Sequence, residues 1–103
     1  MWIGAGKLVL DFHSNDLLRL KKKQLEQLFK ELKKKYNLSI LEVADEDDVE
    51  RCVIGFATVM PEDWREVGAK GFVQKIIGTI DEISFARISV DEWQVYWFDK
   101  GAD

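Results

Sequence analysis

Cysteine, histidine and proline each occur only once in the 103 residues, as Cys52, His13 and Pro61. A lone cysteine cannot form an internal disulfide, and together with one histidine it cannot supply the four ligands of a structural zinc site. Apolar runs are also short, and none reaches the roughly 20 residues that a membrane-spanning helix needs. The sequence therefore argues against a disulfide-stapled scaffold, a zinc finger and a membrane helix, and we expect no metal or other cofactor.

We expect no secretion signal either, because residues 1–10 have no basic flank and no small-residue cleavage site. A single thiol suits a reducing compartment, so we expect a cytoplasmic protein. The length is that of one domain. With 47% apolar and 33% charged residues, the chain can build one core and a solvated surface. We therefore expect a single domain over residues 1–103.

Hydrophobic periodicity predicts six elements in the order β, α, β, β, α, β. They are strands over residues 2–12, 38–43, 52–60 and 83–90, and helices over residues 17–36 and 72–81. Residues 93–98 either extend the last strand or form another. With right-handed crossovers, this order gives an α+β ferredoxin-like βαββαβ sandwich, a four-stranded antiparallel sheet with both helices on one face. The other face of the sheet is then open.

Four glycines interrupt these patterns. Gly4 and Gly6 lie on one face of the first strand, where a missing side chain lets a helix or an aromatic ring pack close. Gly68 and Gly71 precede the second expected helix, and each weakens a helix by about 1 kcal/mol relative to Ala. The segment is predicted to be a kink or loop. As a Gly-x-x-Gly turn that contains Lys70, it also resembles the backbone clamp of KH domains.

Charge is segregated along the chain although the net charge is only −4. Residues 19–35 carry a local charge of +6, and residues 42–50 carry −6. Lysines on one exposed helix face are what phosphate contacts need. The candidate nucleic-acid-binding residues are Lys22, Lys23, Lys30, Lys33, Lys34 and Lys70. Lys21 lies near the apolar stripe and is expected to extend past the sheet edge, which favours a structural role for it.

Aromatic residues are dense near the end of the chain. Trp93, Val95 and Trp97 share one strand face, and Tyr96 and Phe98 share the other. Aromatic side chains at this density are rarely left bare. They either close the core within the chain, or form a homo-oligomer interface through Trp93, Val95, Trp97 and Phe98.

Features for catalysis are few, and we assign no catalytic residue. His13 lies beside Asp11 and Asp16 in a turn, a setting more typical of an exposed residue than of a general base. Cys52 begins a core strand and is expected to be a buried thiol. Phe56, in a run that partly matches the RNA-contacting strand of RRM domains, is expected in the core. The sequence favours a non-catalytic protein over an enzyme.

Several motifs resemble the YlxP-like family, a bacterial family of unknown function. They are Leu20-Lys21-Lys22-Lys23-Gln24, Tyr36-Asn37-Leu38-Ser39-Ile40-Leu41-Glu42-Val43, the acidic pair Asp45 and Asp47, and Arg51-Cys52-Val53-Ile54-Gly55. The resemblance implies a ferredoxin-like fold and a cytoplasmic protein, and members often lie among genes for translation and ribosome maturation. It implies no activity.

The first functional hypothesis is accordingly a non-catalytic interaction module that associates weakly with RNA or the ribosome through the basic helix. The alternative is a homo-oligomeric module that self-associates through the open sheet face or the aromatic C-terminal strand. A small-molecule sensor or an enzyme on the open face is a third reading.

Overall fold

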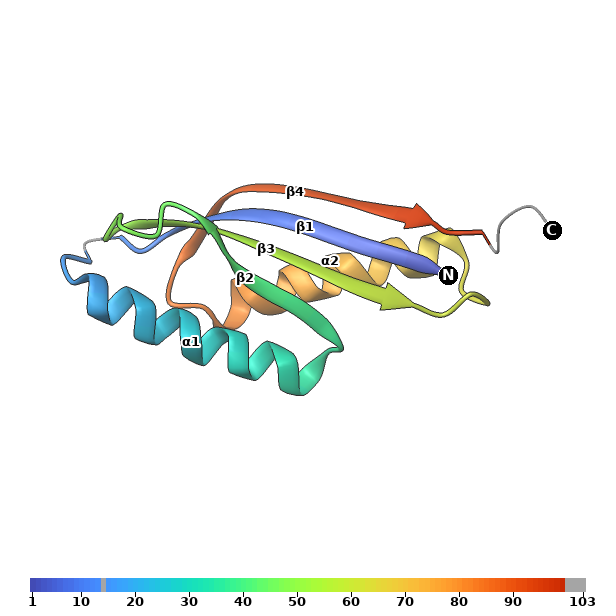
Figure 1. Ribbon diagram of the computed structural model, residues 1–103, viewed down its shortest axis with the longest axis horizontal. Coiled ribbons are helices and arrows are strands. Elements are labelled where there is room, and N and C mark those ends of the chain that lie inside the picture. Colours follow the sequence, from blue (N-terminus) through green and yellow to red (C-terminus); the bar gives the residue numbers. More distant parts are fainter. Residues whose placement is uncertain (14, 100–103) are drawn as a thin grey trace.

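The computed structural model describes residues 1–13 and 15–99. Its elements are β1 (Trp2–Asp11), α1 (Leu18–Lys35), β2 (Leu38–Ala44), β3 (Arg51–Met60), α2 (Glu66–Ile83) and β4 (Arg87–Trp97). Both helices lie on the same side of a four-stranded antiparallel sheet, as Figure 1 shows. The α+β ferredoxin-like arrangement expected from the sequence is confirmed.

Strand β1 lies in the middle of the sheet, whose order is β2-β3-β1-β4. It pairs along its whole length with β3, from Trp2 opposite Met60 to Asp11 opposite Arg51. On its other side it pairs with β4, and Trp2 lies opposite Trp97. The residues from Trp93 to Trp97 therefore extend the last strand, one of the two alternatives left open by the sequence.

The predicted start of the last strand is wrong. Ile83 is the final residue of α2, and β4 begins only at Arg87. The reason is the helical spacing of Ile76, Ile80 and Ile83, which continues the apolar stripe of α2 for one more turn. Residues 84–86 instead form the connection between α2 and β4.

The core lies between the helices and one face of the sheet. It is built from alternate residues of β1 and β3, such as Leu8, Leu10 and Ile54, and from the inner faces of α1 and α2. The opposite sheet face is not covered by any element of the described chain. Four large apolar side chains on it are between 46% and 55% exposed: Leu41, Val43, Val59 and Tyr96.

Gly4 and Gly6 make room for close packing, as expected. A Cβ atom at Gly4 would overlap Val73 of α2, and one at Gly6 would overlap the ring of Phe56, at under 3.0 Å in both cases. Helix α2 thus approaches the sheet over Gly4, and the Phe56 ring lies over Gly6. Phe56 is buried in the core, in agreement with the sequence analysis.

The helix that was predicted to begin near residue 72 begins at Glu66, so the predicted break at Gly68 and Gly71 is wrong, and so is the clamp-like turn. Both glycines lie inside the continuous helix α2. The buried side of the helix, which runs from Ala69 through Val73 to Ile80, explains the difference. Burial of a large aliphatic side chain contributes about 1.5–3 kcal/mol, so several of them outweigh the helix penalty of two glycines.

Candidate functional site

Helix α1 has one buried side and one strongly basic side. Leu25, Leu28 and Leu32 are buried against the core. The side turned away from the sheet carries the lysines that the sequence analysis singled out, and all five are exposed: Lys22, Lys23, Lys30, Lys33 and Lys34. The helix lies at one edge of the molecule in Figure 1, so a large partner has free access to this side.

These lysines are poorly neutralised within the protein. Lys34 lies 3.4 Å from the carboxylate of Glu31, an exposed pair of the kind that contributes little to stability. In the described part of the chain, the other four form no ion pair. Lys33 and Lys34 lie in the last turn, where positive charge complements the helix dipole. Lys23 and Lys30 lie further back in the helix, where this stabilising effect is absent.

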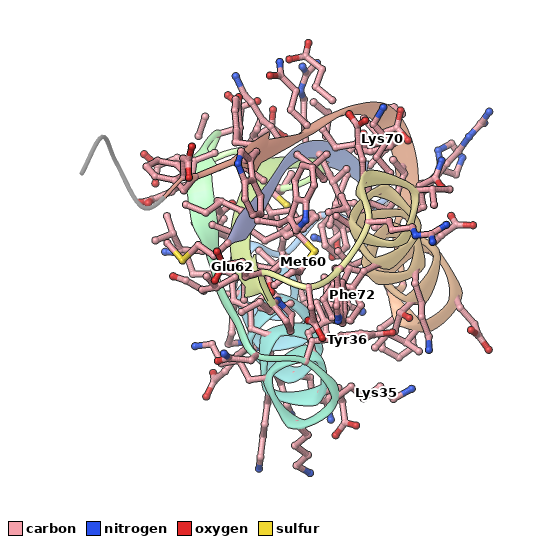
Figure 2. All side chains as sticks on the ribbon, turned by 90° about the vertical axis from the view of Figure 1, so that its right-hand side faces the viewer. Lys35, Tyr36, Met60, Glu62, Lys70 and Phe72 are labelled. Carbon is pink, nitrogen blue, oxygen red and sulfur yellow. The ribbon has the colours of Figure 1, made fainter. Side chains whose placement is uncertain are left out.

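Lys70 does not join this group. It lies on α2 and pairs with Glu66 one turn earlier, at 3.4 Å. In Figure 2, Lys70 and Lys35, the last residue of α1, lie on opposite sides of the molecule. The structure therefore brings together the five lysines of α1 and separates the sixth candidate from them.

Lys21 has a different role from its neighbours on α1. Its side chain is fully buried, so the expectation that it reaches solvent past the sheet edge is wrong. Its Nζ atom donates hydrogen bonds to backbone carbonyls in the turn that joins β2 to β3 and at the first residue of β3. They belong to Asp45 at 2.9 Å, Glu46 at 3.2 Å, Asp48, and Arg51 at 3.0 Å. The carboxylate of Glu42 lies 3.1 Å away.

Lys21 therefore ties the acidic turn to the first turn of α1. Three N–H groups are shared among five oxygens, so every proton of the buried ammonium has a partner. The turn is further ordered by Asp48, whose side chain accepts hydrogen bonds from the backbone N–H groups of Glu50 and Arg51 at 2.9 and 3.0 Å. Asp45 adopts a positive φ of 60° within it. Its carboxylate lies 3.1 Å from Arg51 Nε.

The result is a fixed separation of charge. The acidic turn lies beside the start of α1, at the left end of Figure 1, while Lys30, Lys33 and Lys34 lie toward the other end of the helix. The positive charge of α1 is therefore least opposed by the acidic turn along the later turns of the helix.

The aromatic residues near the end of the chain divide into two groups. Trp93 and Val95 are half-buried and pack against the core, so they are covered within the chain. Trp97 and Phe98 are 45% and 54% exposed. The Trp97 ring lies on that of Trp2, with 5.0 Å between the centroids. Trp97 and Phe98 thus remain the exposed part of the predicted oligomer interface.

An aromatic cluster closes the gap between the two helices, as Figure 2 shows for Tyr36 and Phe72. Phe72 packs edge-on against Tyr36 at 5.6 Å and against Trp64 at 5.4 Å between ring centroids. The hydroxyl of Tyr36 is hydrogen-bonded to that of Thr79 at 2.7 Å. These contacts fix the position of α1 relative to α2, and with it the direction in which the basic side faces.

The residues considered for catalysis are His13 and Cys52. His13 is exposed in the connection between β1 and α1. Cys52 is buried, and burial together with the nearby Glu42 carboxylate raises the pKa of its thiol to about 12, so it is not a nucleophile at neutral pH. Over residues 1–13 and 15–99, no three His, Cys, Asp or Glu side chains gather as they would around a metal ion. None of the helices described has the length and apolar character to cross a membrane.

A groove beside α1 contains an aromatic residue that the sequence analysis did not single out. Phe85, in the connection from α2 to β4, is 71% exposed. The groove measures about 210 Å³ and is lined by Gln24, Gln27, Leu28, Glu31, Ile83 and Phe85. No local pattern marks this site, because residues more than 50 positions apart form its two walls.

Comparisons with known proteins give a family and no activity. No curated protein matches the chain. Among solved structures, the chain is similar to the de novo designed protein Ferredog-Diesel, with a TM-score of 0.38 and 17% identity over 92% of this chain and 84% of that one. Residues 3–91 match the family model described as a protein of unknown function, DUF503, and the chain belongs to this family.

Proposed function

We propose that this protein is a non-catalytic interaction module that binds RNA through the basic side of α1. The observation that carries the proposal is the presence of exposed lysines in the middle of the helix, Lys23 and Lys30, that are not neutralised by the described part of the chain. Phosphate contacts require lysines in this arrangement, on one exposed face of a rigid element. The resemblance to the YlxP-like family, whose members lie among genes for translation, agrees with RNA as the partner.

The salt dependence of RNA binding tests this proposal. Five lysine–phosphate contacts to a single strand give a slope of about −3.5 in log K against log salt, or roughly a 100-fold loss of affinity between about 50 and 200 mM salt. The triple variant Lys23→Glu, Lys30→Glu, Lys34→Glu should bind far more weakly and with a shallower slope. Fluorescence anisotropy with a labelled single-stranded RNA measures both quantities.

The control variant changes two lysines on the other helix, and its matched counterpart on α1 is the double variant Lys23→Glu, Lys30→Glu, which has the same number of Lys→Glu changes. Lys70→Glu with Lys75→Glu on α2 should leave the slope nearly unchanged, because Lys70 lies apart from the lysines of α1. Equal loss in both variants would indicate a response to net charge alone. Absence of binding at low salt would refute the proposal.

A second candidate function is self-association through the open sheet face. The observation that favours it is the group of exposed apolar residues on that face, among them Leu41, Val59 and Tyr96. Lys7 and Glu92 lie opposite each other across β1 and β4, so the face carries both signs of charge and can complement a second copy. Four strands of 7 to 11 residues, about 4.8 Å apart, offer roughly 600 Å² per copy, near the lower limit for a stable dimer.

Light scattering tests self-association. We expect a dimer for the wild type and a monomer for Leu41→Lys with Val59→Lys, because two desolvated ammonium groups per copy would oppose the contact. Trp97→Ala is the control, since Trp97 packs on Trp2 and lies on the face that the helices cover. A monomeric wild type, or a dimer that only Trp97→Ala dissociates, would exclude the open face as the interface.

A further inference from the structure

We infer that the groove between α1 and the α2–β4 connection binds an unpaired nucleobase, with Phe85 as the stacking surface. The inference rests on the proposed function and makes it more specific, because it names single-stranded RNA as the ligand and places one base of it. Five observations support it: the exposure of Phe85, its rigid support, the free amides facing it, the size of the groove and its position next to the lysines.

Phe85 is exposed by the way its connection is held. The backbone N–H of Ser84 donates to the carbonyl of Ile80 at 3.0 Å and continues the hydrogen-bond pattern of α2 for one residue. The Ser84 hydroxyl donates to the carbonyl of Ala86, also at 3.0 Å. These two bonds hold the residues on either side of Phe85, whose ring remains 71% exposed. An aromatic ring on a rigid connection is what base stacking requires.

The wall opposite Phe85 supplies groups for the edge of a base. Gln24 and Gln27 line the groove from α1, and neither amide makes a hydrogen bond within the described part of the protein. An amide both donates and accepts, so it can pair with the edge of any base. Glu31 adds a carboxylate, which accepts hydrogen bonds from amino groups and repels phosphate. The groove therefore fits a base better than it fits the sugar-phosphate backbone.

The groove also has a suitable size and position. Its volume is about 210 Å³, whereas a cavity that holds a single water molecule needs only about 10–15 Å³. At 3.6 residues per turn, Gln27 lies within about 40° of Lys23 and Lys34 around the axis of α1. A strand whose base enters the groove would thus have its phosphates beside these lysines. In Figure 1, the α2–β4 connection reaches the middle of α1.

Binding of three ligands by matched variants tests the inference. The ligands are a labelled single-stranded RNA, an abasic oligonucleotide with the same number of phosphates, and an RNA duplex. Phe85→Ala should weaken binding of the single strand by about 5- to 150-fold, the usual range for loss of one stacked base. It should leave binding of the abasic strand unchanged, and Phe85→Tyr should retain the wild-type affinity. Val67→Ala is the control, because Val67 is another exposed apolar residue, on α2.

Failure of the inference can be separated from failure of the proposed function. If the lysine variant loses binding while Phe85→Ala binds the single strand like the wild type, the groove does not hold a base and the proposed function stands. Equal affinity of the wild type for the abasic and the intact strand, or tighter binding of the duplex, also overturns the inference. If the wild type binds none of the three ligands at low salt, both proposals are wrong. Circular dichroism of Phe85→Ala verifies that the variant is folded.

Discussion

Replacement of Lys21 by Met should lower the free energy of unfolding by about 3–5 kcal/mol, the usual cost of removing one partner of a buried ion pair. The substitution keeps an unbranched side chain, one atom shorter, but leaves four backbone carbonyls and the Glu42 carboxylate without their cation. Glu42 Oε2 is buried, and over residues 1–13 and 15–99 it has no hydrogen-bond partner to replace this ion pair. Urea unfolding followed by tryptophan fluorescence measures the change.

Two further variants separate the buried ion pair from a general effect of charge. Lys22→Met changes the neighbouring, exposed lysine and should alter stability by no more than about 0.5 kcal/mol. The double variant Lys21→Met, Glu42→Met should be no less stable than Lys21→Met alone, because it removes the orphaned carboxylate. A Lys21→Met protein within 1 kcal/mol of the wild type would contradict this account of the acidic turn.

Gly6→Ala should destabilise the protein by about 1–3 kcal/mol although it adds only one methyl group. The new Cβ would overlap Cε1 of Phe56 and lie 2.6 Å from Cζ, both in a ring that is buried and cannot swing away. Trimming that ring in the double variant Gly6→Ala, Phe56→Leu should cost less than the sum of the two single changes. Thermal and urea unfolding of the wild type, Gly6→Ala, Phe56→Leu and the double variant provide the four free energies of this double-mutant cycle.

A Gly→Ala substitution on the exposed side of α2 should have the opposite effect on stability. Gly71 lies inside α2, and a Cβ there would meet no atom within 4 Å. Gly71→Ala should therefore stabilise the protein by about 0.5–1 kcal/mol through helix propensity. If Gly6→Ala is neutral or stabilising, the close contact between β1 and the Phe56 ring is not the reason for a glycine at this position.

The sequence predicts a feature well where the residues that cause it lie close together in the chain. Gly4 and Gly6 share a face with Leu8, so their alternation alone predicted a close neighbour on that side. Helical spacing predicted that Lys23, Lys30 and Lys34 are exposed, since they lie opposite the buried leucines. In both cases the periodicity of one element carries the information.

Features that depend on distant backbone could not be predicted in this way. The partners of Lys21 include four backbone carbonyl groups between 24 and 30 positions away. Every residue has such a carbonyl, so the sequence does not show which of them accept hydrogen bonds from Lys21. Gly68 and Gly71 suggested a break because the local propensity was considered without the buried stripe that α2 packs on the sheet. Phe85 was assigned to a strand, so its exposure beside α1 was missed.

A titration of the ¹⁵N-labelled protein with single-stranded RNA, followed by amide chemical shifts, tests the central claim most directly. We predict that the largest changes map to α1 around Lys23, Gln27 and Lys30 and to the connection around Phe85. Residues of the open sheet face, such as Leu41 and Val59, should remain unperturbed. Changes confined to that sheet face, or no changes at low salt, would contradict the assignment of α1 and the adjoining groove as the RNA-binding surface.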